Sequence, residues 1–135
     1  MHRSLLLLAP ALVLAAPEGA GAQAAKPALY TADQATAGAA IYASSCAACH
    51  GTQMEGVAAP ALKGPAFGDM ATAQGMTAQA LLDVVTNTMP QSDPGSLKPA
   101  ENSAVTAYIL QQNGYPAGTT ALAPGAAGLS AKITP

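Results

Sequence analysis

The sequence predicts an all-α fold, with three or more helices joined by long loops. Three stretches carry helix signals: residues 31–45, 77–89 and 100–112. In each of them small or apolar residues recur at helical spacing, and residues that favour helix ends flank the stretch. No convincing strand and no internal repeat occurs in the sequence. The 135 residues are therefore expected to form one small helical domain.

The first predicted helix begins with a capping box. Thr31 has the preference for an N-cap, and Gln34 follows three residues later, where its side chain can return to the cap backbone. An alanine-rich segment then continues to about Ser45. This helix is expected to deliver Cys46 at its C-terminal end.

The second predicted helix begins at Thr77 as its N-cap and is stopped by Pro90. Met89 is therefore expected at the end of a helix, where the chain turns. The third helix spans residues 100–112, and Gly114 follows it in the order typical of a helix end.

The connecting segments are rich in residues that interrupt helices. Residues 51–75 contain several glycines and prolines, and we expect an irregular loop there with no regular element of any length. Residues 91–99 are a second turn-rich loop. Residues 117–135, rich in Ala, Gly, Pro and Thr, are expected to be a poorly ordered, flexible tail. The domain proper is then residues 31–116, preceded by a short lead at residues 23–30.

The first 22 residues have the features of a signal peptide. A weakly cationic start runs into about a dozen apolar residues, which is too short for a membrane span of roughly 20 residues. Ala20-Gly21-Ala22 supplies small residues for cleavage before Gln23. An uncleaved anchor is the rival interpretation, and nothing later in the chain is expected to hold it in a membrane. Export to the bacterial periplasm is therefore expected.

The charge balance excludes one class of partner. Five basic residues face seven acidic ones, which gives a formal net charge of −2. A nucleic-acid-binding surface needs clustered positive charge, and this sequence does not provide it.

The two cysteines of the chain lie in one pentapeptide, Cys46-Ala47-Ala48-Cys49-His50. Two thiols three positions apart, followed at once by a histidine, are what covalent attachment of a c-type haem needs. The thiols form thioethers with the two vinyl groups, and the imidazole of His50 ligates the iron. The sequence therefore predicts one covalent haem c held by Cys46, Cys49 and His50.

Three other interpretations of the pentapeptide fit the sequence less well. A structural zinc site needs four ligands, and the chain has no second Cys/His pair to complete it. A thioredoxin-like dithiol would follow a strand in a βαβ unit, whereas this segment has a helical pattern. A disulfide between Cys46 and Cys49 would close too small a loop to stabilise the fold much.

The sixth iron ligand is expected to be a methionine. After loss of residues 1–22, His50 is the only histidine left, and the remaining methionines are Met54, Met70, Met76 and Met89. Met54 is four residues from His50 and reaches at most about 14 Å, too short a path to the opposite haem face. Met89 is favoured because it precedes a proline at a helix end, and Met76 is the next choice. An open sixth position remains the alternative.

Pro60 is a candidate for the contact that orients the haem ligand. It lies ten residues after His50, so its carbonyl is placed to accept the Nδ1 hydrogen and fix the imidazole tautomer. The alternative is that Pro60 is only a loop proline.

With these motifs in place, the chain resembles the small monohaem class I cytochromes c over about residues 31–118. Residues 38–42 look like the N-terminal helix of that family, and residues 105–110 look like its C-terminal helix. The resemblance implies that the two helices cross closely, with Gly38 facing Tyr108.

Two further strings, residues 89–97 and 108–118, are similar to cytochromes that accompany or are fused to periplasmic quinoprotein dehydrogenases. Related subunits serve periplasmic molybdenum dehydrogenases, so the strings leave the partner open. The resemblance implies His50/Met89 ligation and electron transfer through an exposed haem edge. The chain departs from mitochondrial-type cytochromes c because it lacks tryptophan and a lysine ring around that edge.

The expected function is that of a one-electron carrier, or an electron-accepting subunit, with no substrate chemistry of its own. Its donor would be a periplasmic dehydrogenase, and its acceptor a terminal oxidase or another cytochrome. A peroxidase-like or ligand-binding haem protein is the alternative, although the second histidine and the arginine that handle protons in such sites are absent from the mature chain. A gas sensor is a further alternative, but it would need an output domain, and no second domain is expected from this sequence.

Overall fold

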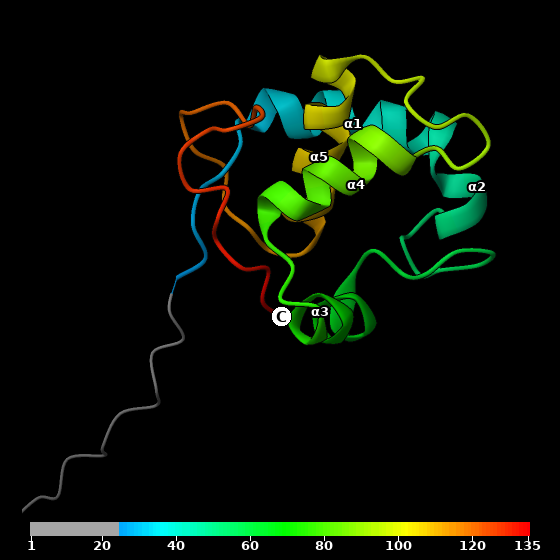
Figure 1. The fold of residues 1–135 in the computed structure, drawn as a ribbon, viewed down its shortest axis with the longest axis horizontal. Helices are drawn as coiled ribbons and strands as arrows, with labels where there is room; N and C mark the ends of the chain where they lie inside the picture. The colour runs from blue at the N-terminus through cyan, green and yellow to red at the C-terminus, as the bar shows by residue number, and fades with distance from the viewer. Residues whose placement is uncertain (1–24) are drawn as a thin grey trace, which may run out of the picture.

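The computed structural model of the protein describes residues 25–135, which form five helices joined by loops (Figure 1). The helices are α1 (Ala32–Ser45), α2 (Ala47–His50), α3 (Gly64–Ala73), α4 (Ala78–Thr88) and α5 (Pro99–Gln112). No strand forms within this range, where extended chain pairs at two isolated bridges, one between Thr31 and Gly118 and one between Thr77 and Lys132. The predicted all-α class is confirmed. The predicted signal peptide, residues 1–22, lies outside the described residues.

The capping box predicted for the first helix is present. The backbone N–H of Gln34 donates to Thr31 Oγ1 over 3.4 Å, and the backbone N–H of Thr31 donates to Gln34 Oε1 over 3.2 Å. Two N–H groups that the helix cannot satisfy internally are thus paired reciprocally. Helix α1 then runs to Ser45, and Cys46 is its C-cap, as expected.

Helices α1 and α5 cross in close contact at Gly38. A Cβ atom on Gly38 would overlap the backbone carbonyl of Ala104 and would lie 2.9 Å from Cβ of Tyr108. One turn further along α1, the ring of Tyr42 packs on that of Tyr108 with the centroids 5.6 Å apart and the planes tilted by 58°. The expected pairing of Gly38 with Tyr108 is confirmed, because only a residue without a side chain fits at this crossing.

Helix α4 begins and ends where the sequence predicted. The side chain of Thr77 accepts from the N–H of Ala80 over 3.1 Å, which caps the first turn. Its inner face is apolar and buries Ala78, Leu81, Leu82 and Val85. The helix ends at Thr88, with Met89 as its C-cap in an extended conformation.

Helix α5 also matches its predicted range, with one added residue at the start. Pro99 occupies the first turn, where its missing N–H costs nothing. At the other end Gly114 takes a φ of 77°, the left-handed conformation that commonly follows a helix. The side-chain amide of Asn113 donates to the carbonyls of Leu62 and Ile109, both at 2.8 Å, which ties the 51–63 loop to this helix end.

The prediction that residues 51–75 contain no regular element is wrong, because α3 forms within them. Gly64 turns the chain with a φ of 75°, and Pro65 then lies in the first turn of α3, where a helix tolerates proline. The residues taken as interruptions therefore mark a helix start. Phe67 and Ala71 lie one turn apart on the buried face of α3, and their burial stabilises a helix that composition alone disfavours.

The prediction of a poorly ordered tail at residues 117–135 also differs from the structure. Leu122, Leu129 and Ile133 are each at most 2% exposed, so the segment packs as part of the core. The lead before the first helix does the same, since Tyr30 is 1% exposed and its hydroxyl donates to the carbonyl of Tyr115. Three widely spaced apolar side chains are enough to hold this segment against the core, because they pack on a surface formed by parts of the chain that are distant in sequence.

Among residues 25–135, no helix has the length and apolar character that crossing a membrane requires.

Because the helices approach so closely at Gly38, we expect alanine to be less favourable than glycine at this position, the reverse of their usual helix propensities. Gly38→Ala should gain about 1 kcal/mol from helix propensity, but the added methyl group overlaps Ala104. We expect a net loss of about 2 kcal/mol in the free energy of unfolding, measured by denaturant titration of the haem-loaded protein. Ala40→Gly, at an exposed position of the same helix, is the control and should lose only about 1 kcal/mol. A Gly38→Ala variant as stable as the parent would contradict the close crossing.

Candidate functional site

The two cysteines and the histidine are presented together by the short helix α2. Cys46 ends α1 and begins α2, with its N–H donating to the carbonyl of Tyr42 over 2.9 Å. The N–H groups of Cys49 and His50 both return to the carbonyl of Cys46. Residues three apart on a helical turn share one face. Both cysteines are free thiols, Cys46 half-buried and Cys49 exposed, so both are available for thioether bonds to one group.

The imidazole of His50 is held in one orientation. Its side chain is 8% exposed, and Nδ1 lies 2.7 Å from the carbonyl oxygen of Pro60. A carbonyl can only accept a hydrogen bond, so Nδ1 carries the hydrogen. The lone pair is then on Nε2, which is free to ligate a metal. The structure thus contains the contact expected between His50 and Pro60.

The loop after α2 brings Pro60 into this position by folding back over the helix. The N–H of Gly56 donates to the carbonyl of His50 over 2.8 Å, and those of Ala58 and Ala59 donate to the carbonyl of Cys49, each over 3.0 Å. These bonds satisfy carbonyls at the end of α2 that have no partner within the helix. The same bonds set the chain direction that ends at Pro60.

Tyr42 is a supporting residue that the sequence reasoning did not single out for this site. It is 2% exposed, and its hydroxyl donates to the carbonyl of Gly51 over 2.6 Å. Burial is the main cause that raises the pKa of Tyr42 to about 12, so the phenol stays neutral and keeps donating. The sequence contains a signal for this role, because Tyr42 lies one helical turn before Cys46. A long side chain at that position can reach the backbone just after the Cys46–His50 motif.

The methionines fall into two groups. Met54 is 2% exposed within the core, and Met70 and Met76 are partly buried against it. Met89 is half-buried at the end of α4. In Figure 1 α4 runs toward the side of the view that holds α2. The structure thus groups Cys46, Cys49, His50 and Pro60 in one segment, while Met89 lies on a separate element, at the end of α4.

Two other interpretations of the cysteines gain no support. Burial raises the pKa of the Cys46 thiol, whereas a redox-active thiol needs a lowered pKa. Within residues 25–135, no group of three or more His, Cys, Asp or Glu side chains is arranged to hold a metal ion. The zinc interpretation therefore gains no support from this part of the chain.

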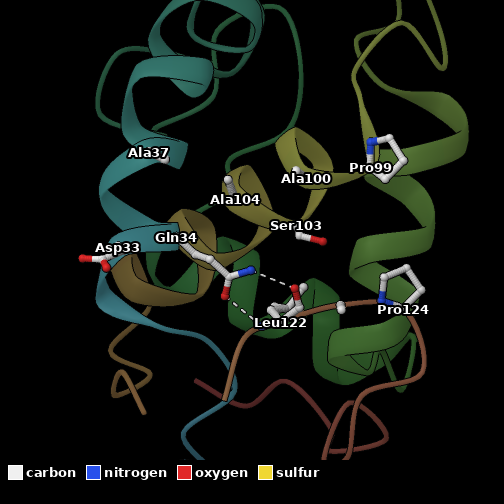
Figure 2. Close-up of a pocket in the computed structure, with 10 residues that line it drawn as sticks. Asp33, Gln34, Ala37, Pro99, Ala100, Ser103, Ala104, Leu122 and Pro124 are labelled. Carbon is white, nitrogen blue, oxygen red and sulfur yellow. Dashed lines mark hydrogen bonds between the residues drawn. The ribbon is translucent and has the colours of Figure 1, made fainter. Parts of the chain in front are cut away.

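A surface hollow formed by the described residues lies away from this site. It has a volume of about 510 Å³ and lies between the start of α1, the start of α5 and residues 122–124 (Figure 2). None of the two cysteines, His50, Pro60 or Met89 lines it. Figure 2 shows instead that the amide of Gln34 reaches across and bonds Leu122. This hollow is a seam between the helices and the C-terminal segment.

The fold and the motif together define a c-type cytochrome with one covalently bound haem. A family model described as "Cytochrome C oxidase, cbb3-type, subunit III" matches residues 33–109. The match covers more than half of the chain and includes nearly all of α1, the whole Cys-x-x-Cys-His motif and most of α5. The chain therefore belongs to this family of cytochrome c domains. The resemblance to class I cytochromes c is confirmed.

Two solved structures are similar to this chain. The first is the sulfane dehydrogenase SoxCD from Paracoccus pantotrophus, with 26% identity and a TM-score of 0.50 over 77% of this chain and 58% of that chain. The second is the "as isolated" form of the thiosulfate dehydrogenase TsdBA from Marichromatium purpuratum, with 32% identity and a TM-score of 0.46 over 63% of this chain and 20% of that chain. The chain thus spans less than two thirds of either neighbour. No curated protein sequence matches it.

The paired thiols predict haem that survives denaturation. On a denaturing gel stained for haem, the parent protein should keep its haem, whereas Cys46→Ser/Cys49→Ser should lose it because no thioether can form. Each single variant keeps one thioether, and its pyridine haemochrome band should shift to longer wavelength. A double variant that still holds haem on the gel would contradict the assignment.

The Tyr42 hydroxyl predicts a measurable stabilisation that disappears at high pH. Tyr42→Phe in the haem-loaded protein should lower the free energy of unfolding by about 1 kcal/mol. The control is Tyr108→Phe, which alters the same ring pair; no hydrogen bond to the Tyr108 hydroxyl occurs in the described residues.

The sign of the pH dependence follows from the raised pKa of Tyr42. The stabilisation is complete below the unfolded pKa of about 10 and is lost as the pH rises through about 12. Ultraviolet titration of the phenols should show an ionisation near pH 12 that is missing in Tyr42→Phe. An unchanged titration would contradict the burial of the Tyr42 phenol.

Proposed function

We propose that this protein is a periplasmic one-electron carrier, or the electron-accepting subunit of a periplasmic dehydrogenase, with a haem c ligated by His50 and Met89. The observation that carries the proposal is the fixed imidazole of His50, which lies in the short helix that follows Cys46 and contains Cys49, and whose Nδ1 hydrogen is held by the carbonyl of Pro60. An imidazole so oriented presents Nε2 as a ligand and suits a permanent cofactor better than a passing substrate.

Each of the site residues has a separate role in holding the cofactor. Cys46 and Cys49 anchor it through thioethers, and His50 supplies the proximal ligand. Pro60 keeps the imidazole in one tautomer and strengthens it as a ligand. When bound, haem c supplies the one-electron ferric–ferrous couple. A thioether from Met89 favours the ferrous state and raises the reduction potential.

Met89 is the preferred sixth ligand for structural reasons as well as from its sequence position. It lies at the C-cap of α4 and is half-buried, so its side chain is not enclosed in the core. Met54, by contrast, is enclosed in the core and close in sequence to His50. Met76 lies in the short connection between α3 and α4, and the backbone on both sides of it is held by hydrogen bonds.

The dehydrogenase partner is supported by the likeness to a chain of the sulfane dehydrogenase SoxCD. We propose that the donor is a dehydrogenase of this general kind, and that the acceptor is another cytochrome or a terminal oxidase. The net charge of −2 gives little long-range steering, which favours a lasting complex over rapid shuttling. Export through the signal peptide would place the chain with such partners.

Paired methionine variants test the ligand. Met89→Ala should abolish the weak far-red sulfur-to-iron band, allow carbon monoxide to bind the reduced protein, and lower the reduction potential by on the order of 100 mV. Met76→Ala, the matched control, should retain the band and exclude the gas. Visible spectra of both oxidation states with and without carbon monoxide provide the measurement.

Two results would count against this ligand set. If Met76→Ala loses the band and Met89→Ala keeps it, the ligand is Met76. If the parent protein is already high-spin and binds carbon monoxide readily, the sixth position is open and a ligand-binding or peroxidase-like function takes precedence.

A native periplasmic extract tests the partner. Affinity purification of the tagged holoprotein should retain a dehydrogenase subunit, and adding that enzyme's substrate should reduce the haem. Isolation of the cytochrome alone, with a haem that the substrate does not reduce, would contradict the subunit proposal and favour a free carrier.

A further inference from the structure

The C-terminal strap, residues 117–135, makes a specific set of bonds to the helix that carries Met89. The N–H groups of Ala78 and Gln79, the first two of α4, donate to the carbonyls of Ala131 and Leu129 over 3.0 and 2.9 Å. A helix leaves its first N–H groups without internal partners. The strap therefore completes the cap of α4 that Thr77 begins.

Further contacts fasten the same point. The N–H of Ile133 donates to the carbonyl of Met76 over 2.8 Å, and the N–H of Gly125 donates to the side chain of Gln79. Leu129 and Ile133 are each 2% exposed, so their side chains are enclosed in the core. In Figure 1 the strap, orange to red, passes the start of α4 and ends near α3.

The strap also has an attachment that does not involve α4. Its Leu122 exchanges two hydrogen bonds of 2.8 Å with the side chain of Gln34 in α1 (Figure 2). Leu122 is 1% exposed. The attachments of the strap thus include one at α1, through Leu122, and one at α4, through Leu129, and both leucines are enclosed.

We propose that the strap is a positioning element for the methionine ligand. It fixes the first turn of α4, and α4 carries Met89 at its other end. An 11-residue helix is about 16 Å long and moves as a rigid rod. If its first turn is free to move, its last turn, which precedes Met89, is displaced as well. This inference rests on the proposed ligation by Met89.

The physical argument is that α4 has few other restraints. It packs on α5 through one apolar face, while Asp83, Val84, Asn87 and Thr88 are exposed. Release of a ligand needs only a local opening of the element that carries it, and weakening a cap makes such an opening more frequent. The anchor at α1 restrains a different helix, so its loss should destabilise the fold without favouring release of Met89.

Two matched variants of the full-length holoprotein separate these roles. Leu129→Ala and Leu122→Ala remove the same atoms from equally enclosed positions of the strap. Imidazole, which competes with the methionine for ferric iron, is titrated while the far-red sulfur-to-iron band is followed, and urea unfolding is measured in parallel. Leu129→Val and Leu122→Val provide a milder pair if the alanine variants do not fold.

We expect both variants to unfold at lower urea concentration, and only Leu129→Ala to bind imidazole about tenfold more tightly than the parent. Equal imidazole affinity in the two variants would overturn the proposal and leave the strap with a general stabilising role. If the parent lacks the band, or Met89→Ala retains it, the ligand assignment itself fails, which is a different outcome from failure of the strap.

Discussion

The close crossing of α1 and α5 at Gly38 is the constraint on which the rest of the structure depends. Because the backbone of α1 lies directly against Ala104, the two helices have little freedom to slide or separate. The crossing sets the position of the C-terminal end of α1, and Cys46 follows there without an intervening loop. It also fixes α5, on which α4 packs. The Cys46–His50 segment and Met89, the two parts of the proposed haem site, therefore both depend on this one contact for their positions.

Hydrogen bonds from loops then refine what the helices position. The 51–60 loop returns to α2 and places a carbonyl at Nδ1 of His50, while Tyr42 holds the chain one residue beyond the histidine. These contacts rigidify a ligand without any charged partner. Such a fixed imidazole suits the electron transfer proposed for this protein, because a rigid ligand keeps the reorganisation small.

The C-terminal strap gives this small domain a second layer. The described chain has only a single phenylalanine and no tryptophan, so its core is made largely from alanine, leucine and tyrosine. Leu122, Leu129 and Ile133 add enclosed apolar area that the helices alone do not supply. The strap thus contributes to the stability of the domain as well as to the placement of α4.

Much of this protein was predictable from its sequence, because the signals concerned are local. A capping box, a threonine cap, and the glycine after α5 act within one helical turn, and the ranges of α1, α4 and α5 follow from them. The Cys46, Cys49 and His50 motif is equally local, since its chemistry needs nothing beyond five consecutive residues. The sequence by itself thus determined the fold class and the cofactor.

Only the tertiary structure decided the rest. Helix α3 was missed because Gly64 and Pro65 interrupt a helix or begin one depending on what buries Phe67. The order of the strap was not predicted because its hydrogen bonds to Gln34, Ala78 and Gln79 join residues far apart in the chain. Such contacts cannot be inferred from composition. The sequence is compatible with Pro60 either as the acceptor for His50 or as a plain loop proline, and only the path of the folded loop decides for the contact. In each case the deciding free energy comes from surfaces that exist only after the chain has folded.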